Sequence, residues 1–326
     1  MRSVTVLRQD HPQTTSTATR ARSGASSGAR SKAHCAACGA TVSRPFRPGP
    51  DGRPGATCPR CGSLERHRFL SLLLGALAPE LTDLDTVVEI APSRQSKALL
   101  DRLPARRRLS FDAGYDAREV DALASLTDLP LRDGSVDLLV CYHVLEHVPD
   151  DRAAMREIAR VLSPRGIALL EVPIRTGVAT EEDVSASPEE CARRFGQRDH
   201  VRWYGDDFDS RLSAAGLASV RVTPPALVGD AAVAWFRLMP HEVVWVVHPG
   251  DTTSPPMLAA DTGSGLAAAF DALLADLART QARLAKARER GDRLAAQRDA
   301  LRAQLAELRA GGVGRALTRL RRGVRL

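Results

Sequence analysis

The sequence predicts an α/β protein in which a largely parallel sheet carries helices on both faces. Three observations predict this class and the two segments that flank the sheet. Short apolar runs alternate with amphipathic runs of helix length between about residues 85 and 250, as in a sheet built from strand–helix–strand units. Two Cys-x-x-Cys pairs precede this region and predict a small metal-binding ribbon. Leucines that recur every seven residues follow it and predict a coiled-coil helix.

Changes in composition divide the chain into segments. We expect a disordered tail over residues 1–31, a metal-binding ribbon over 32–70, the α/β domain over 71–250, a linker over 251–265, a coiled-coil helix over 266–310 and a basic tail over 311–326. The first segment consists mainly of Ser, Thr, Ala, Gly and Arg, which bury too little apolar surface to offset the entropy of ordering. Organelle transit peptides have a similar composition, and this alternative stays open.

The ribbon is predicted by four of the six cysteines. Cys35 and Cys38 form one Cys-x-x-Cys pair and Cys58 and Cys61 form a second, with 19 residues between the pairs. A glycine follows each pair and permits the tight turn that aims both thiolates at one ion. Four thiolates complete a tetrahedral site with no position for water, so we expect a structural zinc ion. The alternative, two disulfides, needs an oxidising compartment that nothing in the sequence implies.

The α/β domain is predicted by short apolar runs bounded by turn-forming residues. They lie at residues 86–90, 109–112, 136–142, 166–172, 218–222 and 242–248. Residues 150–162 carry an apolar stripe opposite a charged one and begin with two aspartates, which predicts an amphipathic helix. Ser-Pro-Arg-Gly at 163–166 is expected to end that helix, and a second helix is expected over 206–216.

The C-terminal helix is predicted by two apolar rows with a seven-residue repeat. One row holds Leu277, Leu284 and Leu305, and the other holds Leu273, Ala287, Leu294, Leu301 and Leu308. Thr280, Gly291 and Arg298 interrupt the rows. We expect this helix to form a homo-oligomer through a coiled coil and to be dispensable for folding. A long solvated helix is the alternative.

Composition and hydropathy argue against a membrane protein. The chain has 326 residues, of which 44% are hydrophobic and 26% charged, and its mean hydropathy is −0.19. Its longest apolar runs are far shorter than the ~18 residues that a membrane-spanning helix requires. No apolar segment typical of a signal peptide follows the first Met. We therefore expect no membrane span and no secretory signal, and we expect a cytoplasmic protein.

The net charge of +7 is unevenly distributed along the chain. Residues 1–70 carry 12 basic and 3 acidic groups, residues 71–262 carry 20 and 30, and residues 263–326 carry 14 and 6. The two flanks are therefore basic and the centre is acidic. A basic footprint across the centre is missing, which disfavours nucleic acid as the partner of the α/β domain.

The first half of the α/β domain has the layout of a nucleoside-binding unit. A strand over 86–90 is followed by a turn, a helix and a second strand that ends at Asp112, 23 residues after Glu89. An acidic residue at that strand end can accept hydrogen bonds from both ribose hydroxyls, and ligands of such sheets bind at the carboxyl ends of the strands.

Three stretches carry a resemblance to a known family. They are SLTDLPLRDGSVDLLVCYHVLEHV at 125–148, RVLSPRG at 160–166 and CPRCGSLERHRFL at 58–70. Over about residues 33–250 the chain resembles the class I S-adenosylmethionine-dependent methyltransferases of the small-molecule type, and its lead-in resembles the subgroup with a zinc ribbon. The resemblance implies a Rossmann-like sheet with S-adenosylmethionine as the cofactor.

The resemblance also implies cofactor-binding residues. The first cofactor loop falls on Glu89, Ile90, Ala91, Pro92 and Ser93, the ribose carboxylate on Asp112, the adenine edge on Ser125 and Leu126, and the methionine moiety and methyl group on Cys141, Tyr142 and His143. The chain departs from the family pattern in two places. Ala91, Ser93 and Gln95 occupy positions where the family has glycines, and Ser125 stands where an Asp commonly contacts the adenine amino group.

The chemistry of methyl transfer suggests catalytic candidates. Displacement at a sulfonium methyl needs positioning, and it needs a base only if the acceptor must lose a proton. His143 lies nearest that chemistry in such folds and is our candidate base; the alternative is a histidine that only hydrogen-bonds a loop. His147 is expected to be its structural partner.

A second group of candidates follows the expected run at 166–172. His200, a second candidate for catalysis, Arg202 and Tyr204 suit an anionic or hydroxylated substrate. A network that pins a loop is the equal alternative for these three residues.

Three functions remain. The favoured one is methyl transfer to a small-molecule or glycan acceptor, with oxygen as the methylated atom. The second is RNA methylation, with the basic ribbon binding the RNA; no Asn-Pro-Pro-Tyr-like loop follows residue 142 to support it. The third is an inactive scaffold that retains the fold.

Overall fold

The structure, a computed structural model, describes residues 33–50, 52–114, 119–250, 279, 283 and 286–308. The tail, linker and basic tail predicted at 1–31, 251–265 and 311–326 lie outside these residues, as does most of 266–285.

The described residues contain a seven-stranded sheet with the order β10-β11-β7-β6-β3-β4-β5. Its strands are β3 (Leu84–Ile90), β4 (Ala105–Asp112), β5 (Ala122–Leu123), β6 (Val136–Tyr142), β7 (Leu162–Glu171), β10 (Leu217–Val222) and β11 (Val244–Pro249). The neighbouring strands β5, β4, β3, β6 and β7 are parallel to one another. Strand β11 runs antiparallel to both β7 and β10. The predicted α/β class with a largely parallel sheet is confirmed.

Each face of the sheet is covered by helices, as predicted. Alternate strand residues such as Val87 and Leu138 pack with α1 (Glu65–Ala76), α2 (Arg94–Leu100), α6 (Pro224–Val228) and α7 (Asp230–Phe236). Their neighbours Val88 and Leu139 pack on the other face with α3 (Asp151–Val161) and α5 (Phe208–Ala214). The strands are apolar on both faces because both faces are buried.

The junction between α3 and β7 differs from the sequence prediction. Asp150 caps α3, because its carboxylate accepts a hydrogen bond of 2.8 Å from the Ala153 N–H. The helix ends at Val161, just before residues 163–166, as predicted, but these residues belong to β7, which begins at Leu162 and not at the predicted residue 166. Gly166 permits this arrangement: a Cβ at that position would lie 2.3 Å from the carbonyl oxygen of Val136 on β6.

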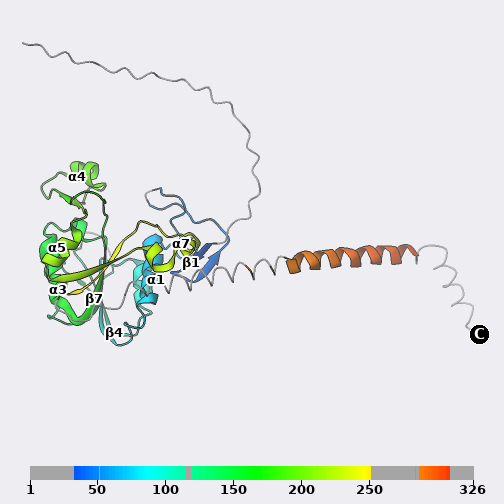
Figure 1. Ribbon diagram of the computed structural model, residues 1–326, viewed down its shortest axis with the longest axis horizontal. Helices are drawn as coiled ribbons and strands as arrows, with labels where there is room; N and C mark the ends of the chain where they lie inside the picture. The colour runs from blue at the N-terminus through cyan, green and yellow to red at the C-terminus, as the bar shows by residue number, and fades with distance from the viewer. Residues whose placement is uncertain are drawn as a thin grey trace, which may run out of the picture. The chain divides into compact units, whose positions relative to one another are not determined.

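The cysteine ribbon packs against the same core as α1 and α7. Its strands are β1 (Ala33–Cys35) and β2 (Ala40–Val42), and Figure 1 shows β1 beside α1 and α7. The fully buried Arg68 of α1 donates hydrogen bonds to the carbonyl oxygens of Ala56 and Ser63, each at 2.9 Å. It also donates to the carbonyl of Phe236 at 2.8 Å, so one guanidinium joins the ribbon to the end of α7.

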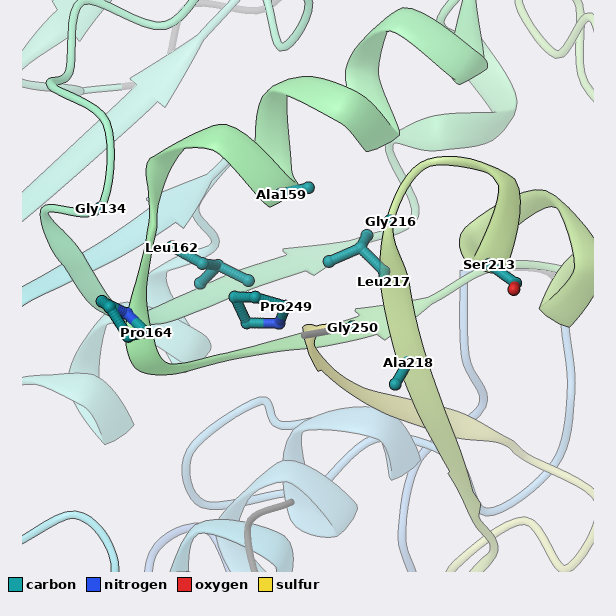
Figure 2. Close-up of a pocket in the computed structure, with 10 residues that line it drawn as sticks. All are labelled: Gly134, Ala159, Leu162, Pro164, Ser213, Gly216, Leu217, Ala218, Pro249 and Gly250. Carbon is teal, nitrogen blue, oxygen red and sulfur yellow. The ribbon is translucent and has the colours of Figure 1, made fainter. Parts of the chain in front are cut away.

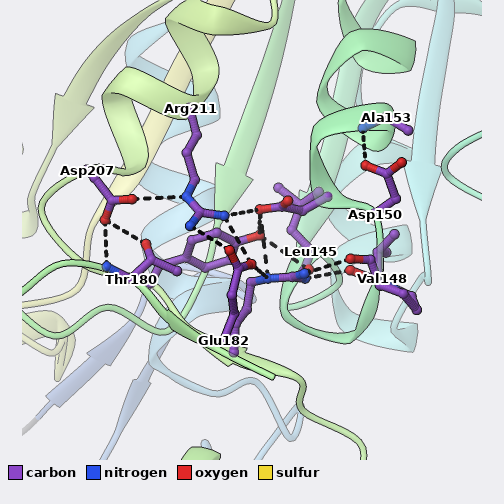
Figure 3. Close-up of polar contacts among 12 residues, drawn as sticks. Leu145, Val148, Asp150, Ala153, Thr180, Glu182, Asp207 and Arg211 are labelled. Atoms are coloured by element: carbon purple, nitrogen blue, oxygen red, sulfur yellow. Dashed lines mark hydrogen bonds and ion pairs between the residues drawn. The ribbon is translucent and has the colours of Figure 1, made fainter. Parts of the chain in front are cut away.

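A segment inserted after β7 forms β8 (Glu181–Glu182), α4 (Pro188–Phe195) and β9 (Arg202–Trp203). The strands β8 and β9 pair with each other and not with the main sheet. A network of ion pairs attaches the insertion to α3 and α5: Arg211 contacts Asp151 at 3.1 Å, Glu182 at 3.0 Å and Asp207 at 3.0 Å (Figure 3).

The C-terminal helix is described over residues 286–308. Four of its leucines, Leu294, Leu301, Leu305 and Leu308, are 49–67% exposed. The upstream members of both predicted rows lie outside the described residues, except Ala287. Within the described part of the chain, no helix combines the length and apolarity needed to cross a membrane.

Candidate functional site

A pocket of about 180 Å³ lies at the carboxyl ends of β3 and β6. Its lining residues are Arg66, His67, Glu89, Ile90, Ala91, Pro92, Ser93, Ser96, Val140, Tyr142 and His143. Seven of them were predicted as cofactor-binding residues. The location follows from the parallel sheet, because loops at the carboxyl ends of neighbouring strands meet there.

The loop after β3 keeps the backbone shape of a glycine-containing turn without the glycine. Ala91 has a φ of 51°, a left-handed conformation that costs an L-residue roughly 1–2 kcal/mol. Its N–H donates to the carbonyl of Phe111 on β4 at 2.7 Å. Ser93 then caps α2, since its Oγ accepts from the N–H of Ser96 at 3.1 Å. The loop therefore has a defined shape despite its departure from the family pattern.

Glu89 is the acidic group of this loop. Only 6% of its surface is exposed. Burial raises the pKa of Glu89 to about 7, although a hydrogen bond from Ser96 and the charge of Lys97 act in the opposite direction. The carboxylate consequently changes its charge close to neutral pH.

Two lining residues, Arg66 and His67, come from α1 and were missed in the sequence. The Nδ1 of His67 accepts from the Leu64 N–H at 3.0 Å, so its Nε2 carries the proton and donates to Ser93 Oγ at 3.1 Å. Burial, assisted by the charge of Arg66, lowers the pKa of His67 to about 3. Both residues belong to CPRCGSLERHRFL at 58–70, which carries the family resemblance, so this stretch could have identified them as pocket residues.

His143 lies between two buried carboxylates. Its Nδ1 is 3.2 Å from Glu146 Oε1, and its Nε2 is 3.3 Å from Glu171 Oε1. Burial alone would lower the pKa of His143, but the charge of Glu171 and hydrogen bonds to both glutamates raise it to about 10. The ring is therefore an imidazolium at neutral pH. Its role as a base stays a prediction, and in this arrangement the ring already holds the proton.

Buried polar atoms without partners lie beside the pocket. The hydroxyl of Tyr142, one oxygen of Glu171 and one oxygen of Glu242 have no hydrogen-bond partner among the described residues. Burial, followed by the charges of these two glutamates, raises the pKa of the Tyr142 hydroxyl. Unpaired buried polar atoms of this kind commonly bind a water, an ion or a ligand.

Four predicted cofactor residues do not line the pocket. Asp112 ends β4, is 7% exposed and accepts from the Gly114 N–H at 2.7 Å. Ser125 shares a hydrogen bond of 2.7 Å with the Thr127 hydroxyl. Leu126 and Cys141 are buried in the core on the α3 side of the sheet. Residues 115–118, which follow the end of β4, are outside the described part of the chain.

The three predicted substrate residues lie in the insertion and are buried. The guanidinium of Arg202 donates to the carbonyls of Leu145 at 2.8 Å and Pro149 at 2.9 Å. The Tyr204 hydroxyl donates to Asp151 at 2.9 Å. These contacts match the loop-pinning alternative for Arg202 and Tyr204. His200 instead stacks edge-on with His147, with ring centroids 4.6 Å apart.

A larger pocket, of about 720 Å³, lies at the opposite edge of the sheet (Figure 2). Leu162 and Pro164 at the start of β7 and Leu217 at the start of β10 contribute to its lining. None of the described residues that line it has an ionisable side chain. The smaller pocket is therefore the candidate site, because the titratable groups gather there.

The four cysteines of the ribbon converge. Their Sγ atoms all lie within 4.8 Å of one another, and those of Cys35 and Cys61 are 3.7 Å apart. A tetrahedral zinc ion with Zn–S bonds of about 2.3 Å places its sulfurs about 3.8 Å apart, so the donor set fits zinc. The hydroxyl of Ser63 lies 3.2 Å from the Sγ of both Cys35 and Cys61.

Comparison with known proteins identifies the domain that carries the pocket. Residues 75–170 match a family described as a methyltransferase domain. Residues 75–170 therefore correspond to a methyltransferase domain. The matched part of the methyltransferase domain includes the loop after β3, Asp112 and His143, whereas Arg66 and His67 precede it.

Relatives of the methyltransferase domain cover only part of the chain. Two proteins of Mycobacterium tuberculosis named probable S-adenosylmethionine-dependent methyltransferase are 30% identical over 156 residues, which are 47% of this chain and 53% of each relative. A ubiquinone biosynthesis O-methyltransferase of Xanthomonas oryzae is 34% identical over 94 residues, 29% of this chain and 36% of that protein. The chain thus matches about half the length of the first two relatives.

Among solved structures, the Burkholderia thailandensis 1,6-didemethyltoxoflavin-N1-methyltransferase is 15% identical, with a TM-score of 0.38. The alignment covers 55% of this chain and 79% of that one.

Proposed function

We propose that the chain is an S-adenosylmethionine-dependent methyltransferase that methylates a hydroxyl oxygen of a small molecule or glycan. The observation that carries this proposal is the pocket within the methyltransferase domain, where the Glu89–Ser93 loop meets Tyr142 and His143. The acidic centre of the sequence supports a small acceptor over a nucleic acid.

The pocket suits one end of the cofactor. Its volume of about 180 Å³ is smaller than the roughly 300–1,000 Å³ of sites that enclose a whole drug-sized ligand. We assign the methionine end to this pocket, with its cationic group next to Glu89. We assign the ribose to Asp112 at the neighbouring strand end, where a carboxylate can accept from both hydroxyls.

When bound, S-adenosylmethionine would supply an activated methyl group. The acceptor oxygen would gain the methyl carbon, the carbon–sulfur bond would break with its electron pair going to sulfur, and the acceptor proton would pass to solvent. Glu171 is not among the described residues that line the pocket. Its Oε1 lies 3.3 Å from His143 Nε2, so we assign Glu171 to orient the ring that does line it.

We also propose that Cys35, Cys38, Cys58 and Cys61 bind one structural zinc ion. The convergence of the four sulfur atoms supports it. Such a site needs reduced thiols, which favours the cytoplasm as its location.

Labelled cofactor tests the function. The full chain is incubated with S-adenosylmethionine carrying a labelled methyl group and with a cell extract separated into small-molecule, glycan and RNA fractions. Label in the small-molecule or glycan fraction supports the proposal, and label confined to RNA contradicts it. Absence of both turnover and cofactor binding by calorimetry would favour the inactive scaffold.

A further inference from the structure

Three metal-ligating side chains meet next to His143, outside the pocket. Glu146 and His147 belong to the short turn η1 (Leu145–His147), and His200 comes from the insertion. One ligand atom from each lies within 4.8 Å of the other two. Glu146 and His200 are buried, whereas the His147 side chain is 30% exposed. Two imidazoles and one carboxylate are a ligand set used for divalent transition metals.

Glu146 provides an observation that does not depend on this clustering. The residue is fully buried, and its Oε1 is engaged by His143 at 3.2 Å. Its Oε2 has no hydrogen-bond partner among the described residues. An unsatisfied buried carboxylate oxygen is costly, and the binding of an ion at this position would satisfy it.

The hydrogen bonds of the two histidines leave the other ring nitrogen available. His200 Nδ1 is 3.1 Å from the carbonyl oxygen of Phe195, and His147 Nδ1 is 3.2 Å from that of Asp199. A carbonyl only accepts, so both Nδ1 atoms donate, and a metal ion can be bound only through the Nε2 of each ring. Histidines that bind metals are commonly oriented in this way, with the remote N–H held by a carbonyl or carboxylate. The Asp199 carboxylate, 3.1 Å from His147 Nδ1, adds to this contact.

The two segments that bring the ligands together are fixed to each other. The Val201 N–H donates to the carbonyl of Glu146 at 2.9 Å. Arg202, also fully buried, donates to the carbonyls of Leu145 and Val148 on the two sides of the turn. The ligands are therefore positioned by main-chain contacts before any ion binds, which is what a metal site requires.

We propose that Glu146, His147 and His200 bind a divalent transition-metal ion, with zinc as the type case. Three protein ligands leave a coordination position open, as in zinc sites that also bind water or substrate. Because Glu146 also contacts His143, this position is suited to an oxygen of the methyl acceptor. That last consequence rests on the proposed function, whereas metal binding does not.

Calorimetric titration with the metal alone tests the site. The full chain is first saturated with Zn²⁺ at the cysteine ribbon, freed of loosely bound ion and then titrated with Zn²⁺ and, separately, with Mg²⁺. We expect one further equivalent of Zn²⁺ and no comparable binding of Mg²⁺, which prefers an all-oxygen shell. His147→Ala and Glu146→Gln should each weaken this second binding by at least about 100-fold, and Asp199→Asn by about tenfold.

His241→Ala provides the matched control, because His241 is exposed and lies outside the cluster. It should bind the second ion like the parent. His147 is partly exposed, so its variant should fold, and circular dichroism checks this. A parent that takes up no second equivalent, a His147→Ala variant that binds as the parent does, or equal affinity for Mg²⁺ would overturn the assignment. No methyl donor is used, so this result is separate from the presence or absence of activity.

Discussion

Glu89 is the carboxylate of the pocket whose charge changes near neutral pH, since burial raises its pKa to about 7. If only the ionised form attracts the cationic end of the cofactor, the competent fraction rises from about a tenth at pH 6 to about nine-tenths at pH 8. The dissociation constant for S-adenosylmethionine should then fall by about tenfold across this range. Calorimetry at several pH values measures it. Glu89→Gln should bind weakly, without this pH dependence; a variant with the same pH profile as the parent would exclude Glu89 as its source.

Asp112 lies at the strand end that we assign to the ribose. Removing its carboxylate leaves two hydroxyls without a charged acceptor, so Asp112→Ala should weaken cofactor binding by roughly 1.5–3 kcal/mol. Asp83→Ala is the control, because Asp83 is exposed just before the opposite end of β3. Equal affinity of Asp112→Ala and the parent would mean that the ribose is held elsewhere.

The left-handed backbone of Ala91, with a φ of 51°, lowers the stability of the folded state. Ala91→Gly should relieve this strain and raise the free energy of unfolding by up to about 1 kcal/mol. Ala159→Gly, within α3, should instead lower it by about 1 kcal/mol. Denaturant titration compares the two. A loss of stability in Ala91→Gly would show that the methyl group contributes more through packing than it costs in backbone strain.

At the level of elements, the ribbon is joined to α1 and α7 by a common core. Cys58→Ser should abolish the proposed zinc site and lower the melting temperature. Since α1 also carries Arg66 and His67 into the pocket, we expect weaker cofactor binding as well. Alkylation gives a readout specific to the ribbon: the four cysteines of the parent should resist the reagent until a chelator is added. Full reactivity in freshly purified, reduced parent protein would rule out a bound metal.

The C-terminal helix exposes Leu294, Leu301 and Leu308 at seven-residue intervals. A single amphipathic helix of this kind gains most of its stability from packing against another helix. We therefore expect self-association, and a truncation after about residue 260 should give a folded monomer that still binds cofactor. Light scattering measures the mass. Leu301→Glu should dissociate the oligomer and Gln304→Glu should not; a monomeric parent at micromolar concentration would refute self-association.

For the whole molecule, local sequence pattern was sufficient to predict most of the sheet. The strand over 136–142 was predicted with its observed bounds, and β3, β4, β10 and β11 were predicted to within a few residues. The exception within the sheet was β5, which has only two residues, both exposed, and therefore no apolar signal. The early start of β7 was also missed, because it depends on pairing between Val136 and Leu162.

The candidate site was predictable where it follows a strand end. The loop after β3, and Tyr142 and His143 at the end of β6, were predicted for this reason. Arg66 and His67 reach the pocket only through the packing of α1, and the partners of His143 include Glu171 on a neighbouring strand. His147 and His200 are brought together by the insertion. Contacts of this kind depend on tertiary structure and have no periodic signature in the sequence.

The hydrogen bonds of Arg68 to Ala56, Ser63, Phe236 and Arg237 all end on main-chain carbonyl oxygens. Carbonyl oxygens do not titrate, and Arg stays charged at every pH at which proteins remain folded. These four hydrogen bonds of Arg68 are therefore insensitive to acidity, whereas the charge of Glu89 is not. A shift of the surroundings toward acid can therefore reduce the charge of Glu89 while the Arg68 hydrogen bonds of the helix that lines the pocket persist.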